Sequence, residues 1–214
     1  MSLARAAELD AVTLDGFRTL VELDAPVERL RAALAEHGVE VWPDEVASAF
    51  AAEVEYYMAH QVDARDEKAL AKLQLDCSTV FLRALPAELE PAEFVSSFVE
   101  ALLFRPLDGV ADALGVLRGA GLALACVSDW DVGIGRQLGR AGLGPFLDVV
   151  VSSAEIGAKK PDPRVFRAAL ERLDVAPERA LHTGDGEGDR AGALAAGLAF
   201  EPAPVATLPQ RLGL

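Results

Sequence analysis

The sequence has few cysteines and no long apolar run, and each shortage excludes a class of protein. Cys77 and Cys126 are the only cysteines in the 214 residues, and they lie far apart in the chain, without metal-ligand spacing. They are expected to be reduced core residues of a cytoplasmic protein. No stretch approaches the roughly 18 apolar residues of a membrane span, and residues 1–10 are too polar for a signal peptide. The sequence therefore predicts neither a disulfide framework nor a membrane protein.

Positive charge is also scarce. The chain carries 20 lysine and arginine residues against 34 aspartate and glutamate residues, which gives a formal net charge of -14. Because nucleic acids and anionic membranes repel an acidic surface, we expect neither as a partner. A small-molecule ligand is the expected partner, and both a monomer and a homodimer fit the sequence.

Apolar residues make up 51% of the chain, enough for one buried domain or for one domain that carries a smaller insert. The first apolar run, residues 11–14, has no polar alternation and stops abruptly at Asp15, which Gly16 follows. Such a run is typical of a strand buried on both faces of a parallel sheet. The carboxyl end of such a strand is where ligands bind.

Residues 24–105 show a helical pattern. Apolar residues recur there every three or four positions, as in the stripe formed by Val46, Phe50, Val54 and Tyr57. Prolines that would suit the first turn of a helix stand near the start of three of the four expected helices, at Pro26, Pro43 and Pro91. Four helices without a strand between them cannot belong to the sheet. We therefore expect residues 24–105 to form an inserted helical domain.

The rest of the chain alternates between strand and helix. After the first strand, further strands are expected at residues 122–127, 149–151, 180–183 and 198–200, with helices between them. This repeated βαβ pattern predicts a Rossmann-like parallel sheet with helices on both faces. Residues 1–23 and 106–214 would form this α/β core domain. The proline-spaced tail from Glu201 is expected to be irregular.

Polar side chains follow four of the expected strands. Asp15 follows the first, Ser128 and Asp129 follow the second, Lys160 lies in the loop after the third, and Asp185 follows the fourth. Each alone has an ordinary structural explanation, such as a helix cap or a turn. Because the carboxyl ends of parallel strands share one edge of the sheet, the four together predict a functional site.

The charges expected at this edge are not balanced. Asp15, Asp185 and Asp189 bring three negative charges against the one positive charge of Lys160, and like charges at short range resist joint ionisation. A divalent cation would balance them, and a set of oxygen ligands suits Mg²⁺. The three histidines are too scattered in the sequence to favour zinc.

Four segments carry a family resemblance. They are Asp15 to Thr19, VSDWD around Ser128, KKPDPRVF with Lys160, and TGDGEGD with Asp185 and Asp189. In this order, and after successive strands, they resemble the four motifs of the haloacid dehalogenase-like (HAD) hydrolase superfamily. The subfamily is the one whose helical cap is inserted just after motif one. The resemblance covers almost the whole chain and implies a HAD-like α/β core with a four-helix cap.

The resemblance also implies a covalent mechanism. The carboxylate of Asp15 would attack the substrate, Ser128 and Lys160 would hold the transferred group, and Thr19 would orient the motif-one loop. Asp129 would lie at the substrate.

Mg²⁺ binding is part of the same implication. Asp15, Asp185 and the backbone carbonyl of Phe17 would bind the ion directly. Asp189 would interact with these ligands or reach the ion through a water molecule. Arg18, which stands where the family has glycine, would crowd or recharge the entrance to the substrate site.

Phe17 departs from the pattern of the family's phosphatases. They have a second aspartate at this position, which protonates the leaving group and later activates water, and such catalysis is worth roughly 100- to 10,000-fold. Asp129, Asp131 and Glu187 are weak candidates to replace it. The sequence thus favours a Mg²⁺-dependent phosphohydrolase of small phosphorylated metabolites, weakened or restricted to activated acyl or aryl phosphates.

Two alternatives stay open. An aromatic residue at position 17 is similar to 2-haloacid dehalogenases, in which the motif-one aspartate displaces halide without a metal. Asp185 and Asp189 would repel the carboxylate of such a substrate, and residues 44–61 contain no lysine or arginine to bind it. The other alternative is a degenerate family member that binds a phosphorylated ligand or protein without turnover.

Specificity would come from the helical insert, which in this subfamily closes over the site. Tyr56, Tyr57 and His60 lie on one turn of the helix expected at residues 44–61. They either contact the ligand or serve packing and solvation, and the sequence does not name the substrate.

Overall fold

A five-stranded parallel sheet organises the larger part of the molecule in the computed structural model, which describes residues 6–214. Its strands are β1 (Ala11–Leu14), β4 (Ala123–Ser128), β5 (Val149–Ser152), β6 (Ala180–Gly184) and β7 (Ala199–Pro202), in the order β5-β4-β1-β6-β7. β1 lies in the centre and is fully buried. The chain leaves β1 toward β4 on one side and leaves β6 toward β7 on the other. A crevice is therefore expected between the carboxyl ends of β1 and β6.

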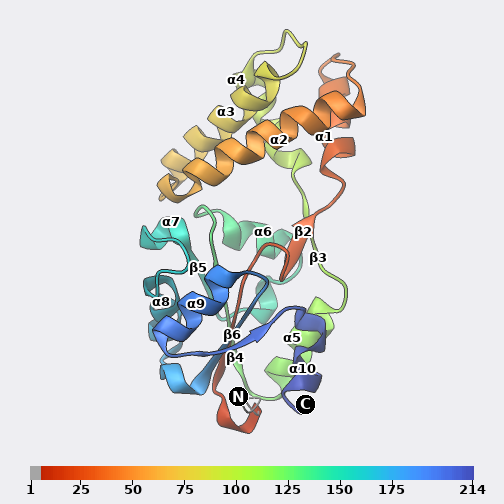
Figure 1. The fold of residues 1–214 in the computed structure, drawn as a ribbon. Coiled ribbons are helices and arrows are strands. Elements are labelled where there is room, and N and C mark those ends of the chain that lie inside the picture. The colour runs from red at the N-terminus through yellow and green to blue at the C-terminus, as the bar shows by residue number, and fades with distance from the viewer. Residues whose placement is uncertain (1–5) are drawn as a thin grey trace.

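Successive residues of the central strands enter opposite cores, as the β period requires. Val12 and Leu14 pack into one core with α5 (Val110–Gly119) and α6 (Ile134–Arg140). Ala11 packs into the other with α8 (Arg164–Leu173) and α9 (Glu187–Ala196). Helices thus cover both faces of the sheet (Figure 1). This confirms the predicted Rossmann-like α/β fold, with strand ends that differ from the prediction by one or two residues.

The expectation of an irregular tail was wrong. The chain forms a 3-10 turn at Val205–Thr207 and then α10 (Leu208–Arg211). Val205, Leu208 and Leu212 are buried in the core that contains α5. Their spacing of three and four residues gives a helical apolar stripe, and Pro209 stands in the first turn of α10, where a proline is tolerated. The neighbouring prolines concealed this stripe in the sequence.

Four helices lie between β2 (Val21–Leu23) and β3 (Phe104–Pro106) and form a module of their own at the top of Figure 1. They are α1 (Pro26–Glu36), α2 (Pro43–His60), α3 (Glu67–Arg83) and α4 (Pro91–Ala101). Three of them begin at the prolines expected there. Phe81, Phe94 and Phe98 are almost fully buried at the centre of the module, which has its own apolar core.

β2 and β3 pair antiparallel and carry the chain into and out of the helical module. The sequence did not predict these strands, because three residues are too few to show a period. The boundaries expected after residue 23 and after residue 105 fall at the end of β2 and inside β3. Short additional segments complete the described chain: α7 (Ser153–Ile156) and 3-10 turns at Ala6–Glu8, Gln61–Asp63, Gly144–Phe146 and Pro177–Arg179. Each helix within residues 6–214 is too short or too polar to cross a membrane.

Candidate active site

The loop after β1 places Asp15 at the centre of the carboxyl edge of the sheet. The amide of Asp15 donates to the carbonyl of Thr183 at 2.9 Å, which ties the loop to β6. Gly16 allows the loop to pass close to β4, because a Cβ at this position would lie 2.8 Å from Oγ of Ser128. Arg18 then adopts a left-handed backbone conformation with φ of 62°. The result is an acid that is only 6% exposed yet borders a cavity.

Lys160 joins the acids of two different strands. Its Nζ donates to Oδ1 of Asp15 at 2.5 Å and to Oδ1 of Asp189 at 2.6 Å, and its side chain is 7% exposed. Ser128 Oγ donates to the same Oδ1 of Asp15 at 3.1 Å. Burial disfavours the ammonium form of Lys160, but the two carboxylates outweigh burial and raise the lysine's pKa above its ordinary value. Lys160 is therefore a fixed positive charge beside Asp15.

Asp189, in the first turn of α9, holds Lys160 in place. Its Oδ1 also lies 3.0 Å from Nε2 of His182, and its Oδ2 accepts from the amide of Gly186 at 3.1 Å. Burial alone would raise the pKa of Asp189, but the contacts with His182 and Lys160 lower it to about 2. Because both carboxylate oxygens accept bonds from the protein, Asp189 is suited to positioning.

His182 is fully buried in β6, and its ring contacts the carboxylate of Asp189. Its Nδ1 lies 2.8 Å from Oγ1 of Thr13, and burial lowers the pKa of the imidazole. A neutral ring that donates from Nε2 to Asp189 and accepts from Thr13 at Nδ1 satisfies both contacts. Sequence reasoning assigned His182 no such role, and its only signal was a polar residue within an apolar strand.

Three carboxylates form a cluster at this edge. Asp15, Asp185 and Asp189 each offer one oxygen, and these atoms lie within 4.8 Å of one another. The Asp185 side chain is 36% exposed, and Nε of Arg18 lies 3.7 Å from its Oδ2. Burial and the nearby charge of Asp15 raise the pKa of Asp185. Clustered hard oxygen donors, one of them open to the cavity, fit Mg²⁺.

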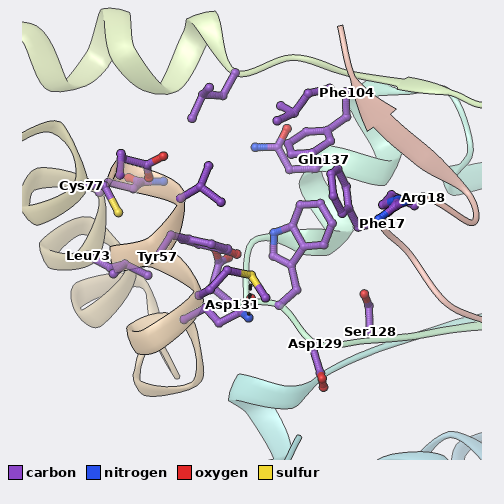
Figure 2. A pocket seen from close by; sticks show the side chains of 18 of the residues that line it. Phe17, Arg18, Tyr57, Leu73, Cys77, Phe104, Ser128, Asp129, Asp131 and Gln137 are labelled. Carbon is purple, nitrogen blue, oxygen red and sulfur yellow. Dashed lines mark hydrogen bonds between the residues drawn. The ribbon is translucent and has the colours of Figure 1, made fainter. Parts of the chain in front are cut away.

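A cavity of about 590 Å³ opens from this cluster toward the helical module (Figure 2). Its wall on the core side includes the predicted site residues Asp15, Phe17, Arg18, Ser128, Asp129, Lys160, Asp185 and Asp189. The wall contributed by the module is mainly apolar and contains no lysine or arginine. Among residues 6–214, the only cations in the lining are thus Arg18 and Lys160, both next to the carboxylate cluster.

Aromatic rings form the part of the cavity wall around position 17. At this position the phosphatases of the HAD-like superfamily, which the sequence resembles, have an aspartate. The ring of Phe17 is 41% exposed and meets the rings of Phe104 and Trp130 edge-on, with centroids 6.5 and 6.4 Å away. Figure 2 shows Phe17 beside Phe104 and above Ser128. No proton donor is supplied by this side chain.

The three candidates for a replacement acid differ in position. Glu187 is exposed, pairs with Arg190 at 3.0 Å and does not line the cavity. Asp129 and Asp131 do line it, and burial raises the pKa of each. Asp129 accepts from the amide of Lys160 at 3.0 Å, and this bond orients its carboxylate.

Asp131 links the core to the helical module. It accepts from the Tyr57 hydroxyl at 2.9 Å and from the amide of Gly133 at 2.6 Å. Two further contacts join the same parts. Arg136 pairs with Glu67 at 2.9 Å, and Nζ of Lys159 donates to the carbonyl of Met58 at 2.8 Å. The module is therefore held over the carboxylate cluster.

Some residues singled out in the sequence lie away from the cavity. Thr19 is 2% exposed, its hydroxyl has no hydrogen-bond partner among residues 6–214, and it does not line this cavity. The rings of Tyr56 and His60 stack on each other outside the lining, with their centroids 4.1 Å apart, whereas Tyr57 is part of the lining. The buried face of α2 also differs from the expected stripe, because Ala49 and Glu53 are buried there.

Comparisons with known proteins agree with this geometry. Residues 10–197 match the sequence model of the haloacid dehalogenase-like hydrolases. The haloacid dehalogenase-like hydrolase domain-containing protein 3 of Homo sapiens is 30% identical over 200 residues, which cover 86% of this chain and 76% of that protein. A phosphoserine phosphatase of Thermus thermophilus is 39% identical over 109 residues, or 50% of this chain and 44% of the phosphatase.

A solved structure extends the agreement to the whole fold. The crystal structure of a defluorinating L-2-haloacid dehalogenase matches with a TM-score of 0.74 over all of both chains, at 19% sequence identity. At that identity the likeness supports the fold alone. With the family match over residues 10–197 and the acids and lysine gathered at the carboxyl edge of the sheet, the chain belongs to the haloacid dehalogenase-like hydrolases.

Proposed function

We propose that the protein is a Mg²⁺-dependent phosphohydrolase that transfers a phosphoryl group from a small phosphorylated metabolite to Asp15 and then to water. The contact of Lys160 with both Asp15 and Asp189, beside the exposed acid Asp185, carries this proposal. In this arrangement the anionic nucleophile Asp15 and the fixed cation Lys160 would lie next to a metal site made of oxygen ligands alone. The family relationship to a phosphatase supports the same reaction class.

The chemistry has two displacements at phosphorus. In the first, an oxygen of Asp15 attacks phosphorus, and the bond to the leaving oxygen breaks as that oxygen departs with the electron pair and takes a proton from water. In the second, water attacks the phosphorus of the aspartyl phosphate and releases inorganic phosphate and the Asp15 carboxylate. Lys160 and Ser128 would hold the phosphoryl oxygens in both steps.

The proposed Mg²⁺ site consists of Asp15, Asp185 and the backbone carbonyl of Phe17, with Asp189 behind them. When bound, the ion neutralises charge on the transferred phosphoryl group. Asp189 would keep Lys160 in position, because its own oxygens already accept from His182 and Gly186. Removal of the ion should therefore abolish turnover and leave the fold intact.

Phe17 restricts the substrates that the site can hydrolyse. An alkoxide leaves poorly without a proton donor, whereas a phenolate or a carboxylate leaves without such help. Of the two candidate replacement acids in the lining, Asp129 is the more available proton donor, since Asp131 already accepts from Tyr57 and Gly133. Aryl and acyl phosphates are thus the favoured substrates.

A second candidate, a 2-haloacid dehalogenase, is favoured by one observation. Phe17 provides the aromatic wall that such chemistry uses, and the cavity above it is mainly apolar. However, the only guanidinium in the lining belongs to Arg18, whose side chain is 73% exposed and neighbours Asp185. A carboxylate substrate would have to approach three acids, which disfavours this reaction.

One panel of assays separates the candidates. Phosphate esters, acyl phosphates and 2-chloropropionate are incubated with the protein, with Mg²⁺ or with a chelator. We expect release of phosphate from aryl and acyl phosphates with Mg²⁺ only. Chloride release in the presence of the chelator would identify a dehalogenase. Phosphate binding without any turnover would identify a binding protein.

A further inference from the structure

One of the ionisable groups that line the cavity belongs to the helical module and plays no part in the proposed reaction. Glu53 lies on the buried face of α2 together with Val46 and Ala49, and it is 4% exposed. Glu53 also borders the cavity. Apolar residues usually occupy such a position, so an acid there needs a separate explanation.

Glu53 has no counter-charge. Within residues 6–214 it forms no ion pair. Burial raises the pKa of Glu53 to about 7, although the nearby thiol of Cys77 acts to lower it. A buried carboxylate without a cation is destabilising, and a leucine of similar size would pack there at less cost.

Glu53 belongs to the cavity wall that the helical module forms, because α2 is part of that module. Figure 2 places Cys77 on the wall formed by the helical module, on the opposite side of the cavity from Ser128 and Asp129. Between these ends the lining is mainly apolar, with Phe17 and Phe104 among its residues, and it also contains the polar side chains of Gln137 and Asp131. The cavity therefore has a charged end at Asp15, a largely apolar wall, and the acid Glu53 on the side of the helical module.

We propose that Glu53 binds an ammonium group of the substrate, so that the site takes phosphate monoesters in which an apolar spacer separates the phosphate from a positively charged amine. This inference rests on the proposed function, which places the phosphate at Asp15 and Lys160. An amine supplies the missing counter-charge to a carboxylate in an apolar wall, whereas a hydroxyl would leave the charge uncompensated. The absence of lysine and arginine from the module wall also disfavours a second anionic group.

Binding of non-hydrolysable ligands tests this inference independently of turnover. Alkylphosphonates and ω-aminoalkylphosphonates of matched chain length are titrated calorimetrically at pH 8 with Mg²⁺ into the wild-type protein and into Glu53→Gln. At the chain length that spans the cavity, the amine should improve wild-type affinity about tenfold or more, as charge-assisted bonds in buried sites do. Glu53→Gln should lose this preference.

Two further variants keep the result interpretable. Glu55→Gln removes the same charge from the exposed face of α2 and should keep the preference for the amine. Glu53→Leu, which should fold at least as stably as the wild type, should prefer the plain alkyl chain. Equal affinity for both series at every length, a preference that persists in Glu53→Gln, or an equal gain from ω-hydroxyalkylphosphonates would overturn the inference.

Hydrolysis of 4-nitrophenyl phosphate by the wild type reports on the proposed function separately. If this hydrolysis is absent while the amine preference is present, the proposed reaction fails and the amine site stands. If hydrolysis is present without an amine preference, only the amine site fails. If neither phosphonate series binds, the phosphate position assumed for both is wrong.

Discussion

Asp15 and Phe17 are two residues apart in the sequence, but the first is buried among polar partners and the second is exposed. Asp15 is nearly buried and accepts from Ser128 and Lys160, whereas Phe17 presents an exposed ring edge to the cavity. Under the proposed mechanism Asp15 would be the nucleophile, but position 17 offers no proton donor for a poor leaving group. The limit on the reaction comes from one side chain, and one substitution can test it.

Phe17→Asp should raise turnover on alkyl phosphates by about 100-fold or more, and on aryl phosphates by less than about tenfold. The reason is that only the alkoxide needs protonation as it leaves. Phe17 is 41% exposed, so the carboxylate can be hydrated and the fold should tolerate it. Values of kcat for a matched pair of alkyl and aryl phosphates check this. An equal change on both would show that Phe17 is not the missing acid position.

Glu53 predicts a pH dependence of stability. Its pKa is raised from 4.5 to about 7 by burial, so the folded state binds a proton that the unfolded state releases between these values. The contribution of Glu53 to stability is therefore present below about pH 4.5 and is lost as the pH rises through 7. The total loss is on the order of 3 kcal/mol, since each pKa unit corresponds to about 1.4 kcal/mol.

Urea unfolding of the wild type and of Glu53→Gln at several pH values measures this effect. The difference in the free energy of unfolding should move in favour of Glu53→Gln as the pH rises from 4.5 to 8. Asp131 and Tyr57, which also border the cavity, are unchanged in the variant, so their titration cancels from the difference. A constant difference across this range would contradict the buried, unpaired state of Glu53.

Among the structural elements, the turn from β6 to α9 places two of the three clustered carboxylates, Asp185 and Asp189. Gly184 ends β6, and a Cβ at this position would lie 2.4 Å from Cγ of Asp189. The absence of a side chain lets the Asp189 carboxylate reach Lys160 and His182 at once. This turn therefore fixes the lysine that neighbours Asp15.

Gly184→Ala should displace Asp189 and lower the free energy of unfolding by about 1–3 kcal/mol, the usual range for overpacking in a buried site. It should also reduce kcat, because Lys160 would lose one of its two anchors. Gly135→Ala in α6 is the matched control, since a Cβ there meets nothing within 4 Å. The control should be neutral or slightly stabilising. Equal behaviour of the two variants in thermal unfolding and in turnover would argue against this role of the turn.

The sequence was informative where an element has a clear period. The uninterrupted apolar strands predicted the parallel sheet, and the polar residues that follow them predicted the edge at which Asp15, Ser128, Lys160 and Asp185 gather. By contrast, β2 and β3 have three residues each and show no period. α10 was missed because prolines surround its apolar stripe.

Contacts that depend on tertiary packing could not be read from the sequence. The expected stripe of α2 was Val46, Phe50, Val54 and Tyr57, but the buried residues are Val46, Ala49 and Glu53, and Glu53 lines the cavity together with the last three residues of the expected stripe. A helix that faces both a core and a cavity has two inner faces, and its period cannot tell them apart. The position of His182 as a polar residue in an apolar strand did not reveal its role either, because its partners come from β1 and α9.

At the scale of the whole molecule, the α/β domain and the helical module, which has an apolar core of its own, meet at one cavity. The α/β core contributes the charged groups, and the helical module contributes a largely apolar wall (Figures 1 and 2). The chain has a formal net charge of -14, yet the only two cations that the described part of the chain contributes to the cavity lining lie beside the carboxylate cluster. A phosphate can thus be attracted to one end of the cavity alone, which gives the substrate a single orientation.

Detection of a phosphoryl group on Asp15 tests the central claim most directly. The wild type is mixed with 4-nitrophenyl phosphate and Mg²⁺, quenched with acid within the first turnover, and analysed by intact and peptide mass spectrometry. We predict a mass increase of one phosphoryl group on the peptide that contains Asp15, and none in Asp15→Asn. Turnover by the wild type without this adduct, or full turnover by Asp15→Asn, would contradict the covalent mechanism.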